Sequence, residues 1–250
     1  MKILLCLVGL GILLLLYMIK QGFGNNVLTH AISAKGQTQK YSLFLISDAH
    51  NRIIHRSVIE KIRGRMDSII IGGDFADSRT SMEKIEENLK RLSAVAPTYF
   101  IWGNNDLEVD QQAFLALFEK YNVKVIHNDS ELICTTPNKI RISAIEFNGT
   151  TTMIKDSLQK CEADEQLIYV SHDPYRFMKV IQYKKPLLFL AGHLHGGQIR
   201  ILNWSVFPKG SFQKSFDVYQ LISNGYGTTL VPFRLGARAE CHIVDIKFKK

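Results

Sequence analysis

The chain has 250 residues, of which 46% are hydrophobic and 22% charged, with 17 glycines and 6 prolines. These proportions exclude a disordered or fibrous chain and allow one folded domain or two small ones. The formal charge of +8 indicates an anionic partner such as a phosphate ester, a membrane surface or nucleic acid, although ordinary solubility charge explains it equally well. We do not expect nucleic acid, because no basic run has interleaved aromatic residues. The four cysteines form no C-x-x-C pair, which argues against a zinc ribbon or a redox motif.

Residues 1–20 are predicted to form a single-pass anchor in the cell membrane. From Ile3 to Ile19 no residue is charged, and Lys2 and Lys20 flank the run. A helix of that length spans about 26 Å, near the roughly 30 Å of a bilayer core. A cleaved signal peptide and a buried core helix are the alternatives. No small-x-small cleavage site directly follows the run, and an apolar helix at an N-terminus is seldom a core helix. Lysines on both sides leave the orientation open.

Residues 21–40 are predicted to be a linker. They are rich in Gly, Asn, Gln, Ser and Thr, and their apolar residues show no sustained period. The folded domain is therefore expected to cover residues 41–250.

Five short apolar runs, each followed by a polar cluster, predict buried strands. They cover residues 41–47, 68–71, 98–102, 166–171 and 187–191. Between them, apolar residues at helical spacing predict one helix that starts at Met82 after an N-cap at Ser81, and another across residues 113–121. The alternation of strands and helices indicates an α/β fold. Residues 217–223 and 241–248 predict further strands with little helix between them.

Residue types that bind metals follow each of the five predicted strands. They are Asp48, His50, Asp74, Asn104, His172, His193 and His195. In α/β sheets the carboxyl ends of the strands form the ligand crevice, so these side chains could converge. Taken singly, most of these clusters could be ordinary polar turns. The sequence Gly-His-Leu-His-Gly-Gly-Gln from Gly192 has fewer structural explanations and favours metal binding.

The ordered series Asp-x-His, Gly-Asp, Gly-Asn-x-Asp, a lone His and Gly-His-x-His resembles the signature of calcineurin-like metallophosphoesterases, over roughly Tyr41 to the C-terminus. The longer Gly-His-x-His-Gly-Gly-Gln and the segment 232–236 are similar to bacterial members with an N-terminal membrane anchor or export signal. The resemblance implies a four-layered αββα sandwich and two divalent metal ions. In that family pattern Asp48, His50 and His195 would hold one ion, Asn104, His172 and His193 the other, and Asp74 would bridge both. Carboxylate and imidazole ligands suit Mn, Fe or Zn.

The resemblance also implies a reaction, in which a bridging hydroxide attacks a phosphate ester in line. Many relatives have His where this chain has Asn105. An amide can hydrogen-bond phosphate but cannot act as a general acid near neutrality. We place Asn105 and Asp106 in the catalytic site, with Asp106 positioning Asn105. The missing His favours a phosphodiesterase; a phosphomonoesterase or protein phosphatase, and a non-catalytic metal-binding module, remain alternatives.

Three further residues are candidates for supporting roles. Arg234 is expected to contact substrate phosphate, while Asp77 and Asp173 are expected to orient metal ligands. Ordinary solvated positions are the alternative for all three. His55 and His127 could supply the missing proton, although nothing in the sequence places them near the site.

Overall fold

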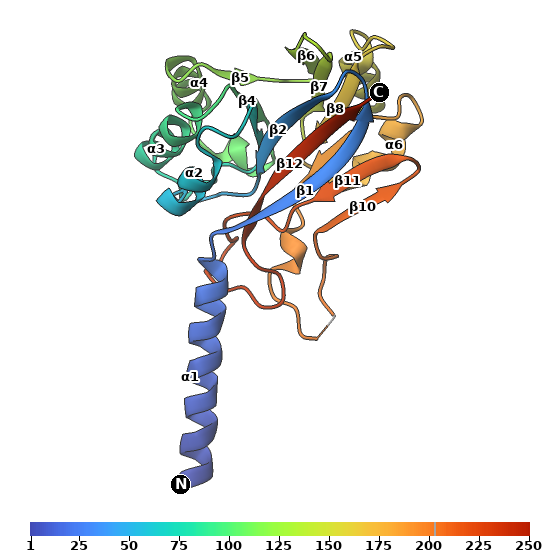
Figure 1. Cartoon of the computed structure of the whole chain (residues 1–250). Helices are drawn as coiled ribbons and strands as arrows, with labels where there is room; N and C mark the ends of the chain where they lie inside the picture. Colours follow the sequence, from blue (N-terminus) through green and yellow to red (C-terminus); the bar gives the residue numbers. More distant parts are fainter. Residues whose placement is uncertain (203) are drawn as a thin grey trace.

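The computed structural model describes residues 1–202 and 204–250. Two six-stranded sheets pack face to face, and helices cover the outer face of each (Figure 1). One apolar cluster lies between the two sheets. A second lies between the first sheet and its helices, and a third lies between the second sheet and its helices. This arrangement confirms the expected four-layered αββα sandwich with an apolar N-terminal helix.

The first sheet has the order β1-β12-β2-β3-β4-β5. Its strands are β1 (Asn26–Lys35), β12 (Glu240–Lys249), β2 (Gln39–Ile46), β3 (Ser68–Gly72), β4 (Thr98–Ile101) and β5 (Val123–Val125). Strands β2 to β5 are parallel, and β12 is antiparallel to β2. The helices on the outer face are α2 (Arg56–Ile62), α3 (Met82–Ser93) and α4 (Gln111–Lys120). The predicted apolar stripe of α3 is buried against this sheet at Ile85, Leu89 and Leu92.

The second sheet has the order β10-β11-β9-β8-β7-β6. Its strands are β10 (Ser211–Ser215), β11 (Val218–Ile222), β9 (Leu188–Ala191), β8 (Gln166–Ser171), β7 (Ile140–Ile145) and β6 (Asp129–Cys134). The four central strands are parallel, and antiparallel β6 and β10 form the edges. Helices α5 (Thr151–Leu158) and α6 (Phe177–Ile181) cover its outer face, and short 3-10 helices lie at η1 (Asn105–Glu108), η2 (Pro174–Arg176) and η3 (His195–Gly197).

The prediction that residues 21–40 form a linker is wrong, because this segment contains β1 and the beginning of β2. Strand β1 pairs with β12 in parallel along its whole length, from Asn26 opposite Glu240 to Lys35 opposite Lys249. An edge strand needs few apolar residues, since only one of its faces is covered. In β1 this short apolar face contributes Ile32 and Ala34 to the cluster between the sheets.

Helix α1 (Lys2–Gly22) projects from one end of the domain as a single rod (Figure 1). Its length and composition allow it to cross a membrane, and a signal sequence would meet the same criteria. The last turn is in contact with the domain: Met18 is buried, and its carbonyl oxygen accepts a 3.1 Å hydrogen bond from the backbone N–H of Arg234. The helix is therefore attached to the folded domain through its C-terminal turn.

The Arg52 side chain, from a loop distant in the sequence, caps the C-terminal end of α1. The Arg52 guanidinium donates hydrogen bonds to the carbonyl oxygens of Gly22, Phe23 and Gly24, at 3.3, 2.8 and 2.8 Å. It also lies 3.9 Å from the centre of the Tyr226 ring. The last carbonyls of a helix have no partner within it and carry partial negative charge, so an arginine at this point satisfies and stabilises them. Arg52 belongs to the loop that follows β2.

Candidate metal centre

The seven predicted metal ligands lie in five loops at the carboxyl ends of β2, β3, β4, β8 and β9. Backbone hydrogen bonds join these loops. The N–H of Asp48 donates to the Gly73 carbonyl at 2.9 Å, and the N–H of His50 donates to the Asp74 carbonyl at 3.1 Å. Across the two sheets, the N–H of His193 donates to Oδ1 of Asp48 at 3.0 Å. The packing of the sheets thus brings together residues that are far apart in the chain.

Five of these residues have left-handed backbone conformations. Asp48, His50, Asp74, His193 and His195 have φ angles of 53°, 48°, 50°, 72° and 50°. This region is unfavourable for residues other than glycine by roughly 1–2 kcal/mol. Strained conformations of this kind cluster at functional sites, where the surrounding structure holds them. Here the turns direct polar side chains back over the ends of the strands.

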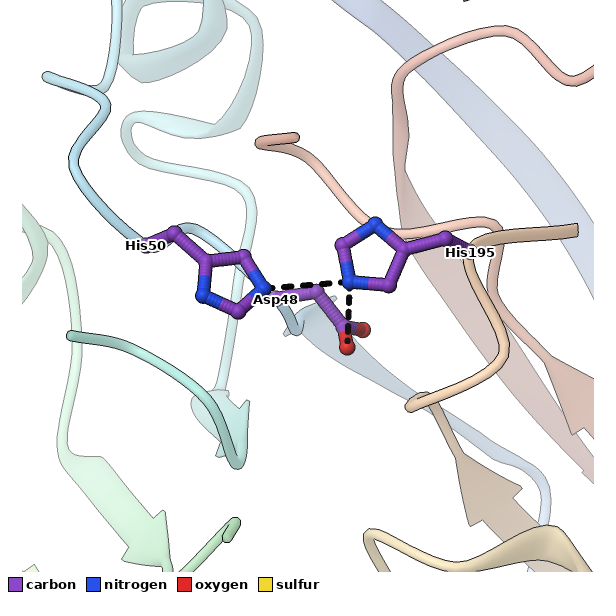
Figure 2. A group of neighbouring side chains, drawn as sticks. All are labelled: Asp48, His50 and His195. Carbon is purple, nitrogen blue, oxygen red and sulfur yellow. Dashed lines mark hydrogen bonds and ion pairs between the residues drawn. The ribbon is translucent and has the colours of Figure 1, made fainter. Parts of the chain in front are cut away.

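Asp48, His50 and His195 form one group of donor atoms, shown in Figure 2. Nε2 of His195 lies 3.0 Å from Nε2 of His50 and 3.3 Å from Oδ1 of Asp48. All three side chains are almost fully buried. Their ligand atoms lie within 4.8 Å of one another, which is close enough for a single ion to contact all three.

Asp74, His172 and His193 form a second group within the same limit of 4.8 Å. Nε2 of His172 lies 3.1 Å from Oδ2 of Asp74, and its Nδ1 is 2.8 Å from the Gly72 carbonyl oxygen. That backbone contact leaves Nε2 directed into the site. The same Nε2 lies 3.8 Å from Oδ1 of Asp48, so the two groups adjoin.

Among the candidate ligands, two buried oxygens lack a hydrogen-bond partner within residues 1–202 and 204–250, namely Oδ1 of Asn104 and Oδ2 of Asp48. The Asn104 amide nitrogen donates to Oδ1 of Asn105 at 3.0 Å, so its oxygen remains available. Buried oxygens are nearly always satisfied in folded proteins. Divalent cations would satisfy both atoms, and the mixture of carboxylate, amide and imidazole donors suits Mn, Fe or Zn.

The site carboxylates stay ionised at neutral pH. Burial alone would raise the pKa of Asp48, but the neighbouring His195, His172 and His50 outweigh it and hold this pKa below its usual range. The pKa of Asp74 is also lowered, since His172 outweighs the opposing effects of burial and of Asp48. Both groups can therefore act as anionic ligands.

The histidines respond to the same charges. Burial would lower the pKa of His172, but Asp74 and Asp48 raise it to about 10, so these carboxylates attract positive charge to Nε2 of His172. Burial lowers the pKa of His193 and of His195, and the adjacent His172 and Arg234 act in the same direction on the respective rings. Neutral imidazole is the form that binds metals.

Asp77 contacts a candidate ligand, as expected. Its Oδ2 lies 3.2 Å from Nδ1 of His50, and the Arg79 side chain donates hydrogen bonds to both oxygens of the carboxylate. Burial would raise the pKa of Asp77, but the bonds from His50 and Arg79 lower it overall. Asp173 is instead engaged by the backbone of Tyr175 and by the Arg176 side chain. Asp77 is thus the carboxylate that fixes the orientation of a site histidine.

We expect Asp77→Asn to weaken metal binding by about 10- to 100-fold, the usual effect of losing an outer partner of a ligating histidine. An amide keeps the size of the side chain but holds the imidazole less firmly. Titration with Mn²⁺ followed by calorimetry would measure the change. The control is Asp173→Asn, which alters a carboxylate beside His172 that faces other partners. Equal losses in the two variants would contradict the role assigned to Asp77.

Arg234 does not contact substrate, so that prediction is wrong. The side chain is completely buried, and its guanidinium donates to five backbone carbonyls. Its Nη2 also lies 3.1 Å from Nδ1 of His195. Burial lowers the pKa of Arg234 to about 10, so it remains a cation at neutral pH. Arg234 therefore supports His195 and the surrounding loops from behind.

Asp106 does not position the Asn105 side chain, contrary to prediction. It is fully buried and accepts hydrogen bonds from the backbone N–H groups of Asp74 and Gly103, both at 2.8 Å, and of Ala76 at 3.0 Å. Burial and the charge of Asp74 raise its pKa to about 7. Asp106 thus holds the Asp74 loop in place and does not face the cavity.

Gly103 allows this close approach of the β3 and β4 loops. A Cβ atom there would collide with the backbone nitrogen and the carboxylate of Asp74. The sequence shows the glycine but not the contact that requires it.

Asn105 is half-buried at the edge of a cavity of about 320 Å³. The cavity wall also includes Asp74, His193, His195 and Phe207. The Asn105 amide nitrogen donates to Glu108 at 2.6 Å, and its backbone N–H donates to Oδ1 of Asp74 at 2.8 Å. Asn105 is therefore placed to meet a molecule that enters the cavity.

Neither alternative proton donor from the sequence lines this cavity in the described part of the chain. His55 caps the N-terminus of α2, and His127 contacts Asn128.

The fold and this cluster place the chain in a known family. Residues 42–208 match the calcineurin-like phosphoesterase superfamily domain, and the chain belongs to that superfamily. It is 34% identical over 228 residues to YpbG of Bacillus subtilis, which covers 89% of this chain and 88% of YpbG. It is also 28% identical over 196 residues to a bovine "transmembrane protein with metallophosphoesterase domain", covering 70% of this chain and 44% of that protein.

Two further relatives bear on activity and fold. Phosphodiesterase YaeI of Escherichia coli is 26% identical over 182 residues, which cover 67% of this chain and 65% of YaeI. The crystal structure of TT1561 from Thermus thermophilus superposes with a TM-score of 0.54 at 11% identity, over 75% of this chain and 90% of that one. The superposition supports the shared sandwich fold.

Proposed function

We propose that this protein is a membrane-anchored, metal-dependent phosphodiesterase with a dinuclear centre. The observation that supports the proposal is that two groups of donor atoms adjoin, where Nε2 of His172 lies 3.1 Å from Oδ2 of Asp74 and 3.8 Å from Oδ1 of Asp48. In this proposal Asp48, His50 and His195 hold one ion, Asn104, His172 and His193 hold the other, and Asp74 lies between them. Such a pair of ions supplies charge neutralisation on the phosphoryl group and activation of water.

The residues of the chain itself favour diesters. Hydrolysis of a diester breaks one P–O bond and yields a phosphomonoester and an alcohol. The carboxamide of Asn105 can hydrogen-bond a phosphate oxygen at the cavity edge, but it cannot give a proton to a poor leaving group. The resemblance to phosphodiesterase YaeI supports the same choice. A phosphomonoesterase or protein phosphatase would depend more on the missing acid, because the looser transition state of a monoester leaves more negative charge on the departing oxygen.

Comparison of two chromogenic esters tests the proposal. The full chain in detergent, reconstituted with Mn²⁺, is expected to bind two ions and to hydrolyse bis-p-nitrophenyl phosphate faster than p-nitrophenyl phosphate. The complete chain is needed because a fragment that starts at Tyr41 would lack β1, which pairs with β12. Faster monoester turnover would overturn the diester preference. Binding of two ions without hydrolysis would support a non-catalytic module instead.

Asn105→His should shift specificity towards monoesters. An imidazole at the cavity edge could donate a proton to the leaving group, and Glu108, which now accepts from Asn105, could orient it. General acid catalysis increases reaction rates by about 10²–10⁴-fold. Because the position of the new imidazole is not optimised, we expect the monoester turnover of Asn105→His to rise by at least about tenfold relative to its diester turnover. The readout is kcat for an alkyl phosphate and the matching dialkyl phosphate, because their alkoxide leaving groups need a proton whereas p-nitrophenolate leaves without one.

The matched control for this substitution is Asn122→His, at an exposed turn after α4. An unchanged ratio of monoester to diester turnover in Asn105→His would show that the missing imidazole does not set specificity.

A further inference from the structure

Large apolar side chains are exposed in two segments near the cavity. We call them the apolar rim; they are Ile201, Leu202, Trp204, Val206, Leu230 and Val231. Leu202, Trp204 and Leu230 are 94%, 73% and 91% exposed. Ile201 and Trp204 exchange two backbone hydrogen bonds of 3.1 Å, so Leu202 lies in the turn that they close. Contiguous exposed apolar groups of this kind mark contact surfaces.

The rim lies at the end of the domain from which α1 projects. In Figure 1 the loop between β9 and β10 extends from the same end of the domain as α1, and Lys209 of this loop lines a cavity together with Tyr17 and Gln21 of α1. The segment that carries Leu230 and Val231 packs on the last turn of the helix. A Cβ atom at Gly22 would lie 2.5 Å from the Pro232 carbonyl oxygen and 3.6 Å from a methyl group of Thr228. The rim therefore continues directly from the anchor.

The length of α1 brings a bilayer up to this surface. Met18 and Gly22 are buried against the domain, which leaves Lys2 to Tyr17 free to cross the membrane. At about 1.5 Å per residue this part spans about 24 Å, less than the roughly 30 Å of a hydrocarbon core. The remaining apolar thickness must meet the domain itself at the level of the last turn. Leu230 of the rim lies at that level, because it lines a cavity together with Gly22 and Phe23.

Charge near the anchor agrees with a lipid surface. Exposed Lys209 and Arg238 line a second cavity, of about 380 Å³, together with Tyr17 and Gln21 of α1. Lys20 lies in the last turn of the helix. Basic side chains at this depth attract anionic head groups by about 1 kcal/mol each. Tryptophan is enriched at membrane interfaces, and Trp204 is exposed in the rim.

The rim also borders the candidate metal centre. Val206 and Phe207 line the same cavity as Asp74, His193 and His195. Gln198, three residues after His195, accepts from the N–H of Thr229 at 2.8 Å and donates to the Thr229 and Val231 carbonyls at 3.1 Å. The two apolar segments are thus joined beside the cavity opening.

We propose that the apolar rim inserts into the bilayer that holds α1, and that the substrate is a phosphate ester carried by a membrane lipid. The lipid would present its phosphate to the cavity while its acyl chains remain between the rim and the anchor. The insertion stands on geometry and exposure alone, whereas the lipid substrate rests on the proposed hydrolase function.

Insertion can be measured without any activity. The chain has two tryptophans, exposed Trp204 and buried Trp102. The Trp102→Phe variant of the full chain, reconstituted in vesicles of phosphatidylcholine and phosphatidylglycerol, should show blue-shifted emission. Lipids brominated on the upper acyl chain should quench it, and aqueous acrylamide should not. A water-like spectrum quenched by acrylamide would overturn the insertion and indicate a protein partner for the rim. If Trp102→Phe folds poorly, the emission spectrum of Trp204 can be obtained by subtracting the spectrum of Trp204→Phe from that of the wild type.

Activity then tests the substrate class. Leu202→Asn should lower turnover of a vesicle-borne phosphodiester by about tenfold, since losing one inserted apolar side chain changes a partition equilibrium by that order. Turnover of soluble bis-p-nitrophenyl phosphate should stay within about twofold, because Leu202 is exposed and is not among the described residues that line the cavity. Leu115→Asn, at an exposed position of α4, is the control and should change neither. Equal turnover of the vesicle substrate by wild type and Leu202→Asn would overturn the lipid substrate. Loss of bis-p-nitrophenyl phosphate hydrolysis in every form would instead refute the hydrolase, while the fluorescence result would stand.

Discussion

Replacing Asp74 with asparagine should lower phosphodiester hydrolysis by at least about 10³-fold, because metal ions at such sites supply several kcal/mol of charge stabilisation. Asp74 is the carboxylate nearest Nε2 of His172, and its charge raises the pKa of that ring. An amide keeps one oxygen that can accept from the Asn105 N–H, so the local fold should survive. Bound Mn²⁺ should fall from two ions per chain towards one, as measured by elemental analysis alongside kcat.

Asp110→Asn provides the matched control for Asp74→Asn. Asp110 caps α4 through the N–H groups of Gln112 and Ala113, and asparagine caps helices equally well. This variant should keep both ions and full turnover. Full activity with two bound ions in Asp74→Asn would remove Asp74 from the proposed bridging position. It would leave the group of Asp48, His50 and His195 in place.

The central strands could be predicted from sequence because they are buried on both faces. The predicted runs 68–71 and 187–191 became β3 and β9 with boundaries shifted by one residue, since continuous apolar stretches have few other solutions. Edge strands were missed for the opposite reason. β1 has one covered face and reads as Asn, Thr, His and Ser between apolar residues, so its pairing with β12 cannot be inferred from the segment alone.

Only those residues of the candidate site that directly follow a strand could be predicted from the sequence. Parallel strands deliver the residues that follow them to one edge, so the order of motifs was sufficient to gather Asp48, Asp74 and His172. The supporting contacts depend on which way a side chain turns. Nothing local to Arg234 distinguishes a buried guanidinium from an exposed one, and Asp106 binds backbone groups 30 and 32 residues away.

Arg234→Lys should destabilise the protein by about 2–4 kcal/mol, because several buried carbonyl oxygens would lose their donors. The guanidinium now serves the carbonyls of His195, Asn224, Gly225, Gly227 and Ala237. An ammonium keeps the positive charge but has only three donors at a single point. Thermal unfolding in detergent should show a Tm lower by about 5–15 °C. Arg238→Lys makes the same chemical change at an exposed position and should shift stability by no more than about 0.5 kcal/mol.

The same variant separates support of the metal site from attachment of α1 to the domain. Arg234 touches α1 through its backbone N–H, which a lysine retains, whereas its side chain alone approaches His195. Arg234→Lys should therefore weaken binding of the ion assigned to Asp48, His50 and His195 while α1 stays docked through Arg52. Calorimetric titration with Mn²⁺ would then show one weakened and one unchanged binding step. Equal weakening of both steps would mean that Arg234 acts through the general stability of the domain and not through His195.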